Sequence, residues 1–221
     1  MDTDRISLKK NRIRRFFLRL DGEEEQKKDE EEKETALESG LTYIQMKLPI
    51  EKITEKMEKQ LRESIESHIK QAKIRECKEE DLPQVMRIYN RAWMTTNTPF
   101  SPIELEDLKN IYQYPHTLIL IANLYGKDVG FIILDFEGEN QEYGVIAGLG
   151  VLPQYQRRGL GRAMAIAAWD EFKSRDVEEL RCEVYEKNTV AHNFIQTIGF
   201  EEYGRQNYTS ADFREPEELI S

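Results

Sequence analysis

Apolar side chains recur at helical spacing over residues 49–72, a segment that begins with Pro49. The apolar positions are Ile50, Ile53, Met57, Leu61, Ile65, Ile69 and Ala72. Glutamate and lysine lie between them, so the pattern predicts one amphipathic helix with a continuous apolar stripe. That stripe must be covered, either by the domain that follows or by the same helix of a second chain in a homodimer.

A mixed pattern of apolar and polar residues follows from residue 73 onward. Strands are predicted at 74–76, 117–123, 128–138, 143–152, 179–186 and 200–208. Helices are predicted at 79–93, 101–114, 159–175 and 189–198. The turn "LYGK" indicates a hairpin between the second and third strands, and the apolar run at 143–152 is typical of a central strand. This order predicts a mixed α/β sheet with one strand-helix-strand crossover.

Charge sets the first 48 residues apart from the rest of the chain. Residues 5–20 are basic with scattered apolar side chains, which is typical of a membrane-surface or partner helix or of an ordinary tail. Residues 21–34 hold nine acidic residues, three lysines and no apolar side chain, so they cannot bury enough surface to fold alone. We therefore predict a charged tail at 1–48, the amphipathic helix at 49–72 and a folded domain at 73–221.

Composition limits the classes of function. The chain has 32 Lys+Arg against 42 Asp+Glu, and this net charge of -10 argues against a protein that mainly neutralises nucleic-acid phosphates. Cys77 and Cys182 lie far apart, so we expect neither a disulfide framework nor a zinc site. No apolar run approaches the roughly 20 residues of a membrane helix, and the N-terminus lacks the apolar segment of a signal peptide. We expect a soluble, cytoplasmic protein.

Glycine and arginine cluster where the strand at 143–152 meets the next helix, in "LPQYQRRGLGRAMAIAAW". The first N–H groups of a helix lack intrahelical partners, and Gly159 and Gly161 leave them open to an anion. Arg157, Arg158 and Arg162 add positive charge at the same point. The junction therefore predicts a phosphate site, or else a glycine turn with solvated arginines.

Two phosphate motifs fit this junction less well. The Walker form G-x-x-x-x-G-K-[ST] is absent. The dinucleotide fingerprint G-x-G-x-x-G would put Glu183 near a ribose, but its third glycine position is Met164.

The stretch "VLPQYQRRGLG", followed by a helix, a strand and "NTVAHNFIQTIGF", resembles the GNAT superfamily of N-acetyltransferases over about residues 74–208. The family signature Q/R-x-x-G-x-G/A matches Gln156, Gly159 and Gly161. The resemblance implies acetyl coenzyme A as cosubstrate. It also implies that the turn holds the pyrophosphate through Gln156, Arg157, Arg158, Gly159, Leu160 and Gly161.

The same resemblance implies a GNAT-like mixed, mostly antiparallel sheet with flanking helices, in which the fourth and fifth strands splay apart. Backbone groups of Leu149, Gly150 and Val151 then pair with the pantetheine arm and the acetyl carbonyl. Independently of the family, glycines at 148 and 150 inside a strand indicate a bulge or a close backbone approach.

The segment "CEVYEKN" resembles the E-V-R-x-x-N of the branch that acetylates the N-terminal alanine of a ribosomal protein. The resemblance implies that Glu183 acts as the base and that Asn188 touches the coenzyme. From the residues alone, Glu183 is equally a solvated strand carboxylate on the face of Arg181 and Tyr185, and Asn188 also suits a helix cap.

That branch carries a tyrosine proton donor where this chain has Ile195, which cannot donate. Tyr185, Tyr203, Tyr208 or water could replace it, or the activity is lost. The sequence thus predicts an N-acetyltransferase that moves acetyl from acetyl coenzyme A directly to a primary amine. An N-terminal α-amine is favoured because its pKa of about 8 leaves part of it neutral at pH 7. The alternative is a non-catalytic acyl-coenzyme-A-binding scaffold.

Overall fold

The computed structural model describes residues 39–66, 72–96, 98–99 and 102–213, and the segments 5–20 and 21–34 lie outside this part of the chain. Its strands are β1 (Leu41–Pro49), β2 (Ala72–Glu76), β3 (Thr117–Leu124), β4 (Lys127–Glu137), β5 (Tyr143–Val151), β6 (Glu179–Tyr185) and β7 (Glu201–Tyr208). Its α-helices are α3 (Glu55–Glu66), α4 (Leu82–Trp93), α5 (Leu105–Tyr112), α6 (Leu160–Lys173) and α7 (Thr189–Ile198).

These strands form one sheet in the order β2-β3-β4-β5-β6-β1-β7. Every neighbouring pair is antiparallel except β5 with β6. The mixed, mostly antiparallel sheet predicted from the sequence is therefore confirmed. The dinucleotide-binding alternative is wrong, because that fold requires a mostly parallel sheet.

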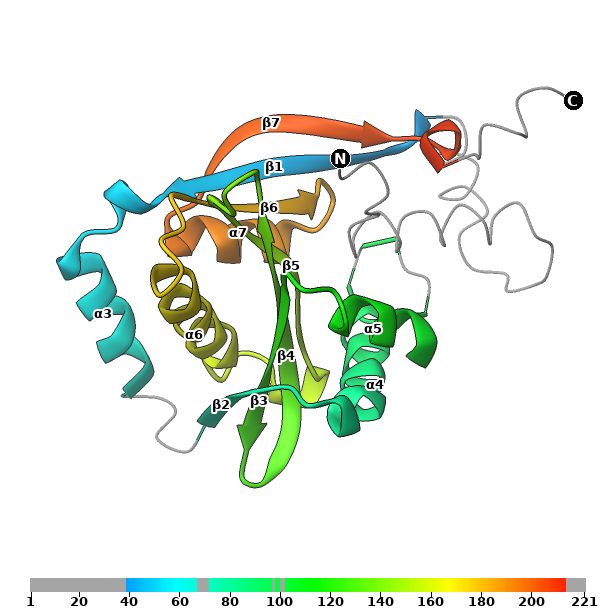
Figure 1. Cartoon of the computed structure of the whole chain (residues 1–221), viewed down its shortest axis with the longest axis horizontal. Helices are drawn as coiled ribbons and strands as arrows, with labels where there is room; N and C mark the ends of the chain where they lie inside the picture. Colours follow the sequence, from blue (N-terminus) through cyan, green and yellow to red (C-terminus); the bar gives the residue numbers. More distant parts are fainter. Residues whose placement is uncertain (1–38, 67–71, 97, 100–101, 214–221) are drawn as a thin grey trace, which may run out of the picture.

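Helices cover both faces of the sheet (Figure 1). Helices α4 and α5 lie on one face, where α4 packs on β4 and β5. Helix α6 crosses the other face, with α3 beside it, and α7 packs on β6. The apolar sides of these elements meet in one buried core, as the alternation along the strands and the helical stripes require.

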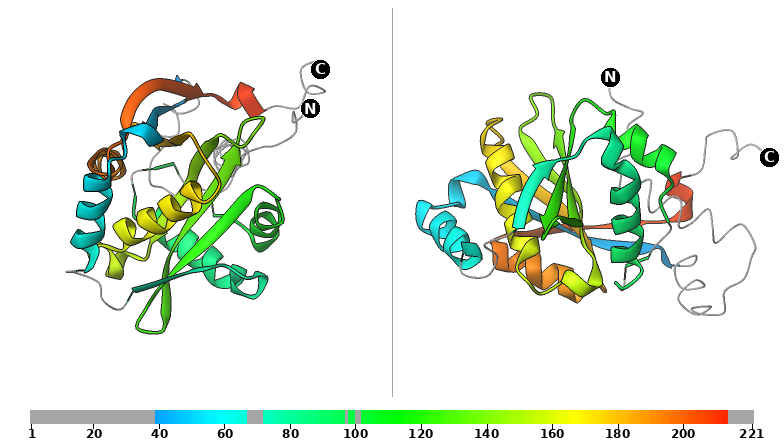
Figure 2. Two further views of the ribbon diagram at one scale, coloured as in Figure 1. Left: turned by 60° about the vertical axis from the view of Figure 1, so that its left-hand side comes forward. Right: turned by 90° about the horizontal axis from the view of Figure 1, so that it is seen from below.

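Residues 41–48 correct the predicted charged tail, because they form most of β1 inside the sheet. This strand pairs with β6 on one edge and with β7 on the other, as the two views of Figure 2 show. Ile44, Met46 and Leu48 alternate into the core, and residues between them face the opposite side. An interior strand forms backbone hydrogen bonds along both of its edges. These bonds hold the short segment in the sheet.

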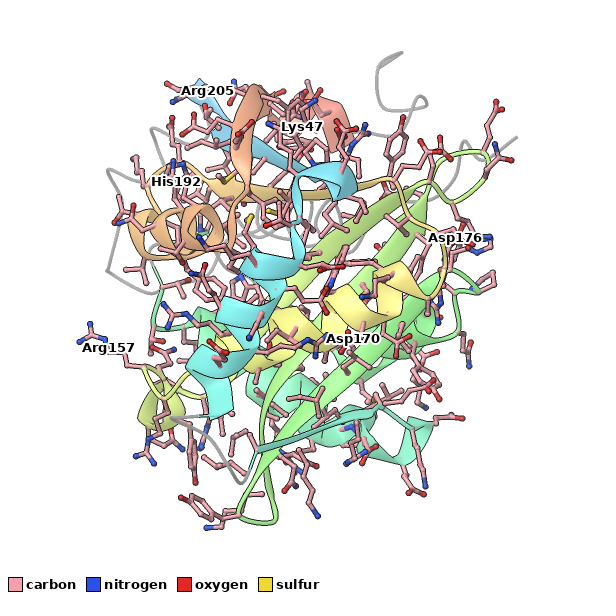
Figure 3. The ribbon with its side chains drawn as sticks, turned by 90° about the vertical axis from the view of Figure 1, so that its left-hand side faces the viewer. Lys47, Arg157, Asp170, Asp176, His192 and Arg205 are labelled. Atoms are coloured by element: carbon pink, nitrogen blue, oxygen red, sulfur yellow. The ribbon has the colours of Figure 1, made fainter. Side chains whose placement is uncertain are left out.

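The predicted helix at 49–72 is also corrected. Residues Ile50–Lys52 form a short 3-10 turn, the α-helix begins at Glu55, and residues from Ala72 onward belong to β2. The helix packs on α6 of its own chain, where Arg62 bonds to Asp170 and Glu58 pairs with Lys173. Figure 3 shows Asp170 on α6. The helix therefore packs on the folded domain of its own chain, and a homodimer through this helix stays a prediction.

Candidate active site

A bulge in β5 changes the direction of its side chains. Gly144 pairs with Phe136 and Gly150 pairs with Phe131, and the register shifts between them, opposite Ile133 and Leu134. A Cβ on Gly144 would meet Phe172 of α6, whereas a Cβ on Gly150 would meet Trp93 of α4. Because both residues are even-numbered, only the extra residue of a bulge can turn them to opposite faces. The bulge predicted from the glycines is therefore present.

Strands β5 and β6 diverge after three paired positions. The parallel pairing runs from Tyr143 with Glu179 to Val145 with Arg181 and ends there. At the far end of β5, the Leu152 N–H donates to the Val129 carbonyl at 2.9 Å. Backbone groups alternate in direction along a strand, so those of Leu149 and Val151 point away from β4 and toward the gap. The strand therefore presents its backbone at the predicted splay.

Gly150 has a different part in this strand from its two neighbours. Its backbone faces β4 by the same alternation, and a Cβ at this position would lie 2.7 Å from Phe131 and 3.0 Å from Trp93. The absent side chain lets α4 pack closely on the sheet. This packing explains the glycine without a ligand.

The turn from β5 to α6 is held by its own side chains and by two residues at positive φ. The Gln156 amide donates to the Val151 carbonyl at 3.0 Å, which closes the 3-10 turn Pro153–Tyr155 onto the strand. Arg157 has φ 58° and Gly159 has φ 82°, the left-handed region in which glycine carries no steric cost. Gln156 thus shapes the loop from within.

The N-terminus of α6 faces outward with arginines beside it. Gly159 is the N-cap residue and provides no side-chain cap, so the first N–H groups of α6 have no capping partner there. Arg157 and Arg158 are exposed, and Arg157 projects away from the protein in Figure 3. The helix dipole and both guanidinium groups make this point attractive to an anion.

Leu160 and Gly161 serve the packing of the same helix. Leu160 is buried in the core, so its side chain anchors the first turn of α6. A Cβ on Gly161 would lie 3.1 Å from the Phe194 ring of α7. The second glycine of the motif therefore permits the close approach of α6 and α7.

Glu183 lies on β6, two residues beyond the last pair with β5, and is half-buried. One carboxylate oxygen accepts a hydrogen bond from the Gln45 amide of β1 at 3.0 Å. The other accepts one from the Tyr208 hydroxyl of β7 at 3.1 Å. The carboxylate is therefore bound by side chains of both strands on its side of the gap.

Three tyrosines surround this carboxylate. Tyr43 lies 5.5 Å from Tyr185 and 5.7 Å from Tyr208, measured between ring centres. Burial raises the pKa of Tyr208 to about 12, so its hydroxyl remains protonated and able to donate. Burial also raises the pKa of the more exposed Tyr203.

Asn188 caps α7, as its second predicted role requires. Its side-chain oxygen accepts from the Ala191 N–H at 3.1 Å, and its amide nitrogen donates to the buried Thr98 hydroxyl at 2.8 Å. This second bond holds the loop after α4 against the start of α7. Contact of Asn188 with a coenzyme remains a prediction. Ile195, at the position of the expected tyrosine, is buried in the core.

Sequence reasoning missed the contribution of β1. Tyr43 and Gln45 were assigned to the charged tail, although "IQMKL" alternates apolar and polar residues with the period of a strand. Five residues of alternation are too few to reveal a strand when the segment before them is strongly charged. Their partners on β6 and β7 lie more than 130 positions away along the chain.

Among the residues that the structure describes, no group of three His, Cys, Asp or Glu side chains is arranged to hold a metal ion. Cys77 and Cys182 are free and buried. None of the described helices is long and apolar enough to cross a membrane.

A model of the acetyltransferase (GNAT) family matches residues 82–200, which is more than half of the chain and includes the β5–α6 turn and Glu183. The chain belongs to the GNAT acetyltransferase family. The match spans the helices and strands on both sides of the gap, so the GNAT fold predicted from the turn is confirmed.

Two of the curated relatives are N-acetyltransferases by name. The N-alpha-acetyltransferase of Sulfurisphaera tokodaii is 28% identical over 143 residues, which cover 60% of this chain and 82% of that protein. The ribosomal protein bS18-alanine N-acetyltransferase of Escherichia coli K12 is 39% identical over 69 residues, 30% of this chain. The matched residues cover 47% of the E. coli enzyme, so this chain spans about half of that enzyme's length.

Among solved GNAT structures, AAC(6')-Iy in complex with the bisubstrate analogue CoA-S-monomethyl-acetylneamine has a TM-score of 0.53. The alignment covers 62% of this chain and 95% of that chain at 21% identity. At this identity the likeness shows the shared fold.

Proposed function

We propose that this GNAT protein transfers an acetyl group from acetyl coenzyme A to the α-amine of a peptide N-terminus, with Glu183 as the base. The observation that carries the proposal is the arrangement across the gap. The part of β5 beyond its pairing with β6 and the N-terminus of α6 lie on one side, and a fixed carboxylate lies on the other.

The β5–α6 side suits an extended molecule that ends in a pyrophosphate. The backbone of Leu149 would pair with the amide groups of the pantetheine arm, as an added strand does, and the Val151 N–H would donate to the acetyl carbonyl oxygen. The start of α6, with Arg157 and Arg158, would bind the pyrophosphate. Acetyl coenzyme A supplies the thioester-activated acetyl group for the reaction.

Glu183 would accept the proton that the attacking amine must lose. Gln45 and Tyr208 each donate one hydrogen bond to a different oxygen of this carboxylate, and each oxygen can accept up to two such bonds. The Val151 N–H would stabilise the negative charge that develops on the acetyl oxygen. As the C–N bond forms and the C–S bond breaks, the departing thiolate takes a proton from water or from a phenol such as Tyr185.

The choice of an α-amine rests on two supports. The pKa of an α-amine is about 8, so part of it is already neutral near pH 7 and a single carboxylate can serve as the base. The pKa of a lysine amine is roughly three units higher. One curated relative is named an N-alpha-acetyltransferase and another an alanine N-acetyltransferase of a ribosomal protein, which favours an N-terminal amine here. The net charge of -10 also attracts cationic acceptors in general.

The test is release of free coenzyme A thiol from acetyl coenzyme A, with peptides bearing free N-termini, acetyl-capped lysine peptides and polyamines as acceptors. We expect turnover on the free-N-terminus peptides and its loss in Glu183→Gln, with coenzyme binding kept in calorimetry. Turnover on polyamines alone would reject the α-amine acceptor. Turnover unaffected by the substitution would reject Glu183 as the base.

A second function, a non-catalytic scaffold that binds acyl coenzyme A, is favoured by one observation. Ile195 is buried in the core at the position where the related branch carries its proton-donating tyrosine. Coenzyme binding without turnover on any amine of the panel would support this function.

A further inference from the structure

We propose that Gln45, from the N-terminal strand β1, is a positioning residue that fixes the Glu183 carboxylate for proton transfer. This inference rests on the proposed function, because it assigns Gln45 a task in that reaction. The family model begins at residue 82, so Gln45 lies in a segment outside the matched region.

Strand pairing places Gln45 beside the carboxylate. Gln45 is the register partner of Glu183 on β6 and of Gly204 on β7. Directly opposite residues of antiparallel strands project from the same face, so the Gln45 side chain needs no unusual path to reach Glu183. The 3.0 Å bond from the Gln45 amide nitrogen to the carboxylate is the result.

Gly204 provides the space for this contact. A Cβ at position 204 would lie 2.6 Å from the Gln45 side-chain oxygen, closer than two such atoms approach. The β1–β7 register also shifts between Gln45 and Met46, which sets the glycine opposite Gln45. A side chain on residue 204 would therefore displace the Gln45 amide.

The two hydrogen bonds to Glu183 reach different oxygens of its carboxylate. Tyr208 holds one oxygen from β7 and Gln45 holds the other from β1, so rotation of the carboxylate breaks at least one bond. Both partners are uncharged donors, because the pKa of Tyr208 is about 12. The two bonds together thus fix the orientation of the carboxylate.

The test compares Gln45→Met, which keeps the length of the side chain and removes the donor, with Gly204→Ala, which displaces the amide from the opposite strand. Gln206→Met on β7 is the matched control, since Gln206 is exposed and its amide bonds to the Asn207 carbonyl. We expect kcat on a free-N-terminus peptide to fall on the order of tenfold in both test variants, as loss of a bond to a charged group predicts. The KM for acetyl coenzyme A and the control should not change.

A double-mutant cycle separates positioning from general structural damage. In the Glu183→Gln background, Gln45→Met should cause no further loss, because its only route to the reaction is through the carboxylate. An equal loss in both backgrounds, or wild-type kcat in Gln45→Met, would overturn the inference while turnover by wild type upheld the proposed function. Absence of turnover by wild type, with coenzyme binding intact, would reject the proposed function and this inference with it.

Discussion

The proposed coenzyme side of the site uses backbone from one continuous stretch, residues 149–161, whereas the acceptor side gathers side chains from three strands. On the first side, Leu149, Val151 and the start of α6 present N–H groups whose direction follows from local conformation. On the second, Gln45, Glu183 and Tyr208 meet only because β1 lies between β6 and β7. Substitution should therefore affect the two sides in different ways.

This difference suggests how one fold serves several acceptors. Backbone groups are the same in every sequence, so a turn of the right shape binds the shared cosubstrate with few required side chains. Acceptor recognition depends on side chains, which can change without altering the sheet. The predictions below test this division, beginning with the largest expected effect.

Replacement of Glu183 by Gln should impair proton transfer on the acceptor side and leave coenzyme binding intact. We expect kcat/KM for the peptide to fall by at least about 100-fold, because a general base contributes that much or more. Calorimetry should show unchanged coenzyme A affinity. Glu186→Gln is the matched control, since Glu186 pairs with Arg205 at 3.5 Å and should leave kcat/KM within twofold. Loss of coenzyme affinity in Glu183→Gln would contradict the separation of the two sides.

Replacement of Gly150 by Ala should act through packing. The added Cβ would meet Phe131 and Trp93, and overpacking of this kind costs about 1–3 kcal/mol of unfolding free energy. Urea denaturation measures this loss, and calorimetry on the folded protein should show coenzyme affinity close to that of wild type. Lost affinity with unchanged stability would instead assign Gly150 to ligand binding.

The Tyr208 phenol should make stability depend on alkaline pH. Its pKa is raised from 10.0 to about 12, so it stabilises the folded state below pH 10 and this contribution is lost as the pH rises toward 12. Wild type should lose stability more steeply than Tyr208→Phe over that range, by about 1 kcal/mol at pH 11. Urea midpoints at pH 8, 10 and 11 measure the difference. Parallel curves would show that the hydroxyl titrates normally.

The smallest effect concerns the arginines beside α6. Arg157→Ala and Arg158→Ala should each weaken coenzyme A binding by about two- to fivefold at low salt, because exposed charges at a helix end contribute little individually. The loss should shrink as ionic strength rises, which calorimetry at two salt concentrations measures. Arg175→Ala, near the opposite end of α6, is the control and should leave binding unchanged. Equal losses at both salt concentrations would indicate a buried contact.

Much of the fold followed from local pattern. The helix at 189–198 was predicted to the residue, because Asn188 and Gly199 mark its two ends and its apolar stripe is regular. The turn "LYGK" was confirmed as the hairpin between β3 and β4, with Tyr125 and Gly126 both at positive φ. The helix predicted from Ser101 begins instead at Leu105, since Glu104 and Asp107 form the capping box there.

The sequence by itself determined the GNAT turn, since the end of β5 before Pro153 and the positive φ of Gly159 depend on local conformation. It also determined which face of β6 carries Glu183, because side chains alternate along any strand. Only the tertiary structure decided that residues 41–49 enter the sheet and that Gln45 and Tyr208 hold Glu183. Contacts between strands so distant in the chain depend on the global register of the sheet, and no local pattern encodes that register.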